Sequence, residues 1–224
     1  LTEEALRLLD AAAPVRLRVY LLARRADALM EDGRSAEALG IADEAMGRAV
    51  EHDLTVDRTD LAATLARLSD SAGDPGESIR RLEVALAAWT TAPDLALLRA
   101  MHILALVHSR QGDHVAARAA FERPRAEARR AGLEWSAFGV DARAMAVTTA
   151  YEMGDWDLAL RLADHATDAG MPSSAAASID AAALGVLAGI LDAVVRGTPW
   201  PQAVTNGLLS GGLAMLVHGV GGGV

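Results

Sequence analysis

The sequence predicts an all-α protein, a right-handed superhelix of antiparallel helix hairpins with a repeat near 40 residues. Composition is the first reason: hydrophobic residues make up 52% of the 224 residues but aromatic residues only 4%, and Ala and Leu favour helix. The second is a set of evenly spaced glycines that interrupt a helical pattern, and the third is a register of small residues around them. The turn signals every 8–12 residues that are typical of β-sandwiches and barrels are missing.

The four glycine turns divide the chain into hairpins. Gly33, Gly73, Gly112 and Gly154 each stand next to an acidic residue and are separated by 40, 39 and 42 residues, close to the length of two helices with two turns. Gly takes the left-handed conformation that ends a helix, and Asp, Ser or Pro suits the start of the next one. The pattern predicts helices over residues 15–31, 35–51, 55–71, 75–90, 94–110, 114–130, 133–152 and 156–169.

Small residues recur at fixed distances from these glycines, as expected where two helix backbones approach closely. They lie five positions after each Gly (Ala38, Ser78, Ala117 and Ala159), twelve positions after (Ala45, Ala85, Pro124 and Ala166) and seven positions before (Ala26, Ala66, Ala105 and Val147). Pro124 departs from the pattern. A proline inside a helix removes a backbone donor and clashes with the preceding turn, so a kink or break is expected there.

The C-terminal region has a different character. We expect residues 1–172 to form four helix hairpins and residues 173–224 to form an apolar C-terminal helix or capping hairpin with a poorly ordered Gly-rich end. Residues 173–196 read as one helix and residues 203–217 as a short apolar helix. The apolar stretch Leu208–Val224 is at the lower edge of membrane-spanning length, and a capping hairpin or dimerising surface is the preferred interpretation.

Composition and charge exclude several classes of function. Without cysteine the chain has no disulfide, no thiolate nucleophile and no cysteine-ligated metal. A formal net charge of −9 disfavours direct binding to a phosphate backbone. The N-terminal residues LTEEALRLLD lack the layout of a signal peptide, so a cytoplasmic location is expected. No catalytic motif, metal site or cofactor is expected, because the carboxylate clusters fall at helix ends and His102, His108 and His114 do not share a helix face.

A binding surface is expected on the first helix of each hairpin, which forms the concave side of a helical superhelix. The positions 13, 10, 6 and 3 residues before each Gly share one helical stripe. Its polar and aromatic members are the predicted groove residues, namely Tyr20, Asp27, Asp60, Arg67, Asp70, Arg99, His102, Asp141, Thr148 and Tyr151. Their mixed charges suit a peptide held through paired charges, and a solvated face with salt bridges is the alternative.

One dense basic cluster stands apart from this stripe. It comprises Arg123, Arg125, Arg129 and Arg130, at the end of the predicted helix 114–130. Cations near a helix C-terminus complement the helix dipole, so a solvated face explains them. Binding of an acidic partner or RNA is the other interpretation.

The register of small residues around a Gly-Asp turn resembles the tetratricopeptide repeat, over about residues 15–170. The period near 40, the segment AYEMGDWDLALRLADHATDAGMP and the later PWPQAVTNGLLSGGLAML resemble the repeat region of large ATP-binding LuxR-type transcription regulators, the MalT-like group common in actinomycetes. Neither a GxxxxGK[ST] stretch nor a recognition helix occurs in the chain, so no nucleotide- or DNA-binding residue is implied.

The resemblance implies a non-catalytic module of a multidomain transcription regulator that binds a protein, a peptide or a small effector. The alternative is a free-standing scaffold or adaptor that holds a peptide in its concave groove. A homodimer through the apolar C-terminal region is compatible with either. An enzyme remains a third alternative, because some helical-repeat proteins host hydrolase sites.

Overall fold

All regular structure in the described part of the chain is α-helical, as predicted. The computed structural model describes residues 2–9, 13–166, 168 and 170–196. The chain forms two compact units, Leu1–Gln111 and Gly112–Val224. The helices of unit 1 are α1 (Thr2–Leu8), α2 (Val15–Glu31), α3 (Ser35–Glu51), α4 (Thr55–Ser71), α5 (Pro75–Ala87) and α6 (Leu95–Arg110). Those of unit 2 are α7 (His114–Arg130), α8 (Ala137–Glu152), α9 (Trp156–Ala163) and α10 (Ser173–Arg196).

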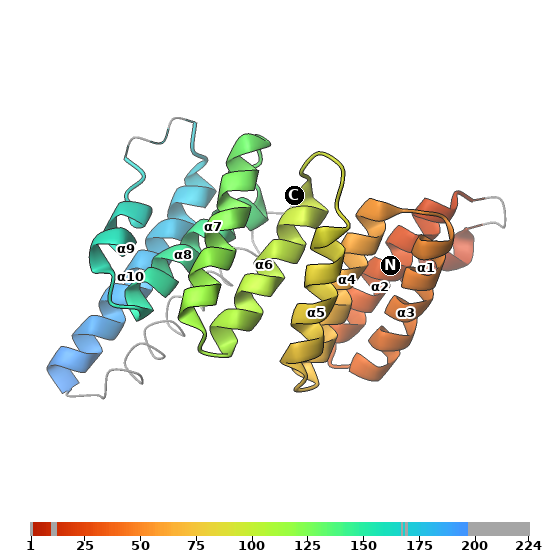
Figure 1. Ribbon diagram of the computed structural model, residues 1–224, viewed down its shortest axis with the longest axis horizontal. Coiled ribbons are helices and arrows are strands. Elements are labelled where there is room, and N and C mark those ends of the chain that lie inside the picture. Colours follow the sequence, from red (N-terminus) through yellow and green to blue (C-terminus); the bar gives the residue numbers. More distant parts are fainter. Residues whose placement is uncertain (1, 10–12, 167, 169, 197–224) are drawn as a thin grey trace. The chain divides into compact units, whose positions relative to one another are not determined.

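Unit 1 is built from helix hairpins whose partners lie side by side (Figure 1). α2 packs on α3, and α4 packs on α5. The first helices of successive hairpins also pack on each other, since α4 contacts both α2 and α6. α1 packs against α2. Apolar side chains fill the space between the first and second helices of the hairpins: Leu61 and Leu65 on α4 and Leu82 on α5 are almost fully buried. The predicted hairpin packing is therefore confirmed in this unit.

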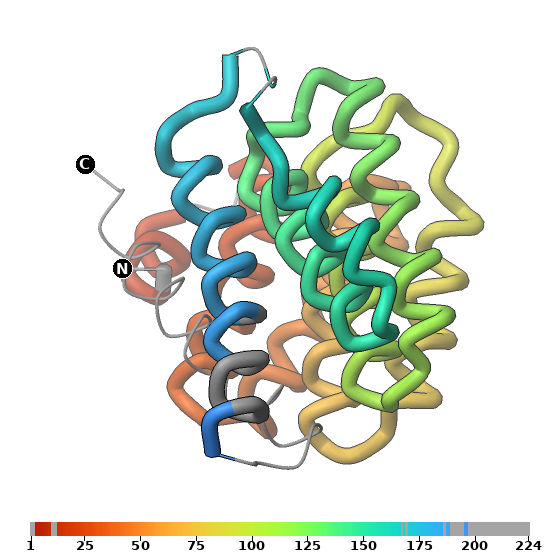
Figure 2. Tube along the Cα trace, turned by 90° about the vertical axis from the view of Figure 1, so that its left-hand side faces the viewer, coloured from red at the N-terminus to blue at the C-terminus, as the bar shows by residue number. Residues whose placement is uncertain are grey.

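Unit 2 is centred on α8. α7, α9 and α10 all pack against it, and α10 also contacts α9 (Figure 2). The core between α8 and α9 includes Val147, Ala150, Tyr151 and Ala159. Because α8 has neighbours on several sides, its buried residues do not form a single stripe. This helix accordingly lacks a clear apolar face in its sequence.

The predicted glycine turns are confirmed. Gly33, Gly73, Gly112 and Gly154 have φ values of 76°, 85°, 75° and 78°, in the left-handed region where a Cβ would be strained. At the second turn the Gly73 N–H donates to Asp70 O at 3.0 Å and the Asp74 N–H donates to Ser69 O at 2.9 Å, which satisfies the last carbonyls of α4. The Asp74 carboxylate then accepts from the Glu77 N–H and begins α5.

Small residues occupy tight helix contacts at two of the three predicted offsets. The third, twelve positions after each glycine, is wrong at Ala166, which is exposed and lies beyond the end of α9, and Ala85 is only half-buried. The residues five positions after each turn glycine are buried, as are those seven positions before. Ala38, Ala117, Ala26 and Ala66 have no exposed surface at all. A larger side chain at these positions would separate the two helices of a hairpin.

Four predicted helix ends are wrong, and local capping explains two of the differences. α6 begins at Leu95, one residue later than predicted, because the Asp94 carboxylate accepts from two backbone N–H groups and acts as the N-cap. α8 begins at Ala137, not at residue 133, because Ser136 is the N-cap and its Oγ accepts from the Gly139 N–H. α5 ends at Ala87, three residues early. α1 was not predicted.

The fourth end is that of α9, which stops at Ala163 and not at residue 169. The Arg143 guanidinium donates to the backbone carbonyls of Leu162 and Asp164 at 2.7 and 2.8 Å. It thereby provides hydrogen-bond donors for carbonyl groups at the helix end that have no donor within the helix. The break expected at Pro124 does not occur. α7 runs without interruption from His114 to Arg130 with this proline inside it.

The C-terminal prediction is confirmed where the structure describes it: α10 has the predicted bounds, 173–196. The predicted helix 203–217 and the stretch Leu208–Val224 lie outside the described residues. Among the described helices none is long and apolar enough to span a membrane. The predicted division at residue 172 follows the repeat pattern and stays a prediction.

Candidate binding surfaces

The predicted groove residues fall on both units, and each unit is considered by itself. Unit 1 contains Tyr20, Asp27, Asp60, Arg67, Asp70, Arg99 and His102 on α2, α4 and α6; unit 2 contains Asp141, Thr148 and Tyr151 on α8. We call the first set, together with the ion-pair partners given below, the polar face of unit 1.

Arg99 is at the centre of the polar face. Its side chain is only 8% exposed, and it donates to Asp27 Oδ1 at 2.8 Å, to Asp60 Oδ1 at 2.5 Å and to Thr64 Oγ1 at 3.0 Å. Burial alone would lower the pKa of Arg99, but Asp60 and Asp27 outweigh it and the pKa is raised. Arg24 pairs with the same two carboxylates. This network joins α2, α4 and α6 through charges that satisfy one another.

Further ion pairs extend the polar face along the same three helices. Arg67 on α4 pairs with Glu31 on α2 at 2.6 Å. Arg110 on α6 pairs with Asp70 on α4 at 2.5 Å. Arg67 and Asp70 were on the predicted stripe, but their partners Glu31 and Arg110 were not identified. The periodicity of one helix does not determine how far a neighbouring helix is shifted along it.

The exposed part of the polar face is at Tyr20. The Tyr20 side chain is 51% exposed, and the Arg24 guanidinium lies over its ring at 5.6 Å from the centroid. Arg67 is also partly accessible, with 32% of its side chain exposed. An aromatic ring beside partly exposed cations is a common element of protein-binding surfaces.

His102 lies in the interior of unit 1, with 6% of its surface exposed. Burial, and to a smaller extent the positive charge of Arg110, lowers the pKa of His102 to about 4. The imidazole is therefore neutral at physiological pH.

Of the three predicted groove residues of unit 2, Thr148 and Tyr151 are buried within their own unit and Asp141 is half-buried. Tyr151 is 2% and Thr148 is 5% exposed, and the Thr148 hydroxyl donates to Ala144 O. Burial raises the pKa of Asp141. α8 is surrounded by α7, α9 and α10, so its stripe faces neighbouring helices. Their role as contact residues for a partner stays a prediction.

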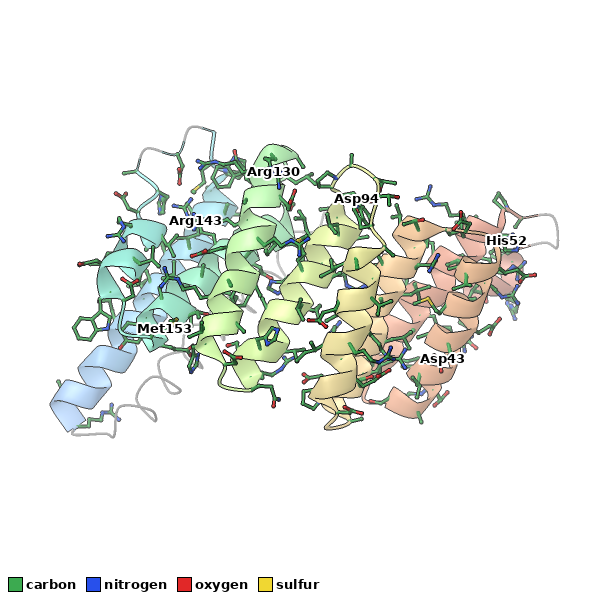
Figure 3. All side chains as sticks on the ribbon, in the orientation of Figure 1. Asp43, His52, Asp94, Arg130, Arg143 and Met153 are labelled. Atoms are coloured by element: carbon green, nitrogen blue, oxygen red, sulfur yellow. The ribbon has the colours of Figure 1, made fainter. Side chains whose placement is uncertain are left out.

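Unit 2 contains a cavity of about 820 Å³ that is lined by most of the basic cluster. The cavity lies between the last turns of α7, the loop before α8, the start of α8 and the end of α9. Arg130 and Arg143 lie toward this end of unit 2, whereas Met153 lies toward the other (Figure 3). Its lining residues are Glu122, Arg125, Ala126, Ala128, Arg129, Arg130, Glu134, Trp135, Gly139, Arg143, Arg161, Leu162, Asp164 and Asp168.

Sequence analysis identified three arginines of this cavity but not Arg143 and Arg161. These two residues come from different helices, 18 residues apart in the chain, and no repeat or motif connects them with α7. Which helix ends meet is a property of the packed unit, so the sequence contains no signal for Arg143 and Arg161 as lining residues.

Groups typical of catalysis are sparse in the described residues. No group of three or more His, Cys, Asp or Glu side chains there is placed to hold a metal ion. His114 Nδ1 lies 3.3 Å from Glu152 Oε2, in a pair at the start of α7 and the end of α8, and burial raises the pKa of Glu152. The clusters at Glu31-Asp32 and Asp155-Asp157 stand at helix ends, where Asp155 is the N-cap of α9.

Comparison with known proteins supports the fold. No protein-family model and no curated protein matches the chain. Among solved structures it is similar to BtubC (BKLC) from P. vanneervenii, with a TM-score of 0.66 and 18% sequence identity over 100% of this chain and 89% of that chain. At this identity the likeness shows a shared helical fold and nothing about activity.

Proposed function

We propose that this chain is a non-catalytic helical-repeat module that binds a protein or peptide through the polar face of unit 1. The observation that supports this most directly is the arrangement of α2, α4 and α6: their inward charges neutralise one another, while Tyr20 and Arg67 remain accessible. A surface fixed by ion pairs between helices loses little conformational freedom on binding, which favours affinity.

The ligand that fits this face best is an extended segment with at least one acidic residue. Arg24, Arg67 and Arg110 are partly exposed cations of the face, and each is already paired with a carboxylate of its own unit. A carboxylate of the ligand would share these guanidinium donors, while an apolar or aromatic side chain would pack on Tyr20. The face is not proposed to hold a metal or cofactor.

Surface variants test the proposal. Tyr20→Ala and Arg67→Glu are expected to weaken capture of the partner from an extract of the source cell, because they change the accessible ring and the accessible cation. Arg48→Glu is the matched control for the charge reversal, since Arg48 on α3 forms a comparable exposed pair with Glu44. Circular dichroism should show an unchanged helical fold for all three. Equal capture by Arg67→Glu and wild type would contradict the proposed surface.

We further propose, from the resemblance of the repeats, that the module belongs to a larger cytoplasmic transcription regulator. Its binding events would then alter contacts with an attached switch domain. An immunoblot of the source cell with an antibody against residues 15–166 tests this. A band several times larger than the 23.3 kDa of this chain is expected.

A free-standing adaptor is the second candidate. One observation favours it: every ion pair of the polar face closes within unit 1, so this surface is complete without another domain. A single immunoblot band near 23.3 kDa would decide for the adaptor and against the regulator.

A further inference from the structure

The cavity of unit 2 contains more positive charge than its own residues neutralise. Five arginines and four acidic residues line it, and each acid already has a partner. Glu122 pairs with Arg118, Glu134 with Arg129 and Asp168 with Arg143, and the Asp164 carboxylate accepts from the Ala166 N–H. Arg130 pairs with Glu127, outside the cavity.

Two arginines remain without such a partner. Among the residues that the structure describes, none forms a hydrogen bond or ion pair with Arg125 or Arg161. Arg161 is exposed, whereas Arg125 is half-buried. A half-buried guanidinium without a carboxylate is costly, because burial removes water that is not replaced by another acceptor.

The surroundings of Arg125 add to this cost. Burial lowers the pKa of Arg125, the nearby charges of Arg143 and Arg129 lower it further, and the charge of Glu122 offsets only part of this effect. Arg143 is held in place, because each of its three guanidinium nitrogens donates a hydrogen bond, to Leu162 O, Asp164 O and Asp168 Oδ2. An anion in the cavity would relieve this repulsion and accept hydrogen bonds from Arg125 and Arg161.

The cavity also has an apolar side. Trp135 is half-buried and lines it together with Leu162 and two alanines of α7. The loop that positions Trp135 lies tightly on α8: a Cβ at Gly139 would come within 2.6 Å of the carbonyl oxygens of Leu133 and Glu134. This close approach fixes the loop, and with it the indole, against the start of the helix.

We propose that this cavity binds a small organic anion, with a carboxylate or phosphate group held by Arg125 and Arg161 and an apolar part against Trp135 and Leu162. A volume of about 820 Å³ falls within the usual range for small-molecule sites and exceeds what a bare inorganic ion fills. A nucleic acid is the less suitable occupant, because the chain has a net charge of −9 and only two of the lining arginines lack a carboxylate partner. The cavity lies wholly in unit 2 and shares no residue with the polar face of unit 1.

Calorimetric titration of the full chain tests the proposal, with inorganic phosphate in one arm, citrate in a second and a single-stranded RNA oligomer in a third. Saturable binding is expected in the phosphate or the citrate arm, and the tighter of the two identifies the anionic group. Arg125→Gln should weaken that binding by about tenfold or more, as for the loss of a charge-assisted hydrogen bond. Arg161→Gln should act in the same direction.

Arg123→Gln is the matched control. Arg123 lies two residues from Arg125 on α7, is exposed and does not line the cavity, so the same change of charge there should leave affinity unaltered. Should Arg125→Gln fail to fold, the exposed Arg161 still provides the test. The proposal is overturned if neither small anion binds, if Arg123→Gln weakens binding as much as the cavity variants, or if only RNA binds.

Discussion

Arg99 contacts two carboxylates and a hydroxyl from two other helices, so its replacement should weaken the packing of α2, α4 and α6 on one another. Arg99→Met is expected to destabilise the fold by about 3–5 kcal/mol, because it leaves Asp27 and Asp60 close together with reduced compensation. Urea denaturation measures the change. Hydrogen exchange should show the loss of protection in α2, α4 and α6.

Arg48→Met is the control for this prediction, since its exposed pair with Glu44 on one helix should contribute less than about 0.5 kcal/mol. Similar losses of stability for the two variants would show that the Arg99 network is no more than a surface ion pair.

His102 makes stability depend on pH in a defined window. Because its pKa is lowered from 6.5 to about 4, the unfolded chain binds a proton that the folded chain takes up only near pH 4. This contribution to stability is complete above pH 6.5 and is lost as the pH falls toward 4, by up to about 3 kcal/mol. His102→Gln should remove this part of the pH dependence, as measured by urea denaturation at several pH values.

His52→Gln, the same substitution at an exposed histidine, is the matched control. If His102→Gln and wild type lose stability in parallel between pH 6.5 and 4, His102 does not titrate as described.

Sequence reasoning at the residue scale selected Asp27, Asp60 and Arg99 from their shared stripe, and the structure brings these three together. It did not identify Arg24 and Thr64, which complete the network, because the chosen offsets fall on the residues immediately before them, Ala23 and Ala63. Hydrogen bonds between helices depend on the lateral offset of the helices, and a periodic pattern within one helix contains no information on that offset.

At the scale of elements, the glycine turns fix where each hairpin reverses. Gly73→Ala is expected to destabilise the chain by about 1–2 kcal/mol, because residue 73 has a φ of 85°. Gly47→Ala should instead stabilise it by about 0.5–1 kcal/mol, since Gly47 is exposed within α3 and an added Cβ meets nothing within 4 Å. Thermal unfolding of the two variants compares these opposite signs, and a loss at both positions would contradict the role of the left-handed conformation.

The helix bounds were predictable where turn chemistry is explicit and not elsewhere. α2, α3, α4, α7 and α10 have the predicted bounds, because Gly, Asp and Ser mark their ends. α9 ends early because Arg143, a residue of another helix, satisfies its last carbonyls. A helix end that is capped by a residue of another helix cannot be recognised from the sequence around that end.

At the scale of the whole molecule, the repeat of about 40 residues predicted the helical hairpins correctly, since hairpin stacking requires only local periodicity and small residues at close contacts. The candidate sites were less predictable. On α2, α4 and α6 the predicted stripe includes both accessible residues such as Tyr20 and buried ones, Arg99 and His102, and on α8 it faces neighbouring helices. The cavity of unit 2 depends on which helix ends meet, which is a property of the packed unit.

In-cell photo-crosslinking tests whether the polar face of unit 1 is the surface that binds a partner, as we propose. A photoreactive amino acid replaces Tyr20 on α2 in one variant and Val84 on α5, which is 60% exposed and outside the polar face, in another. A specific cross-linked partner is expected from position 20 and not from position 84. Cross-linking from position 84 alone would contradict the account and would assign binding to the opposite layer of helices.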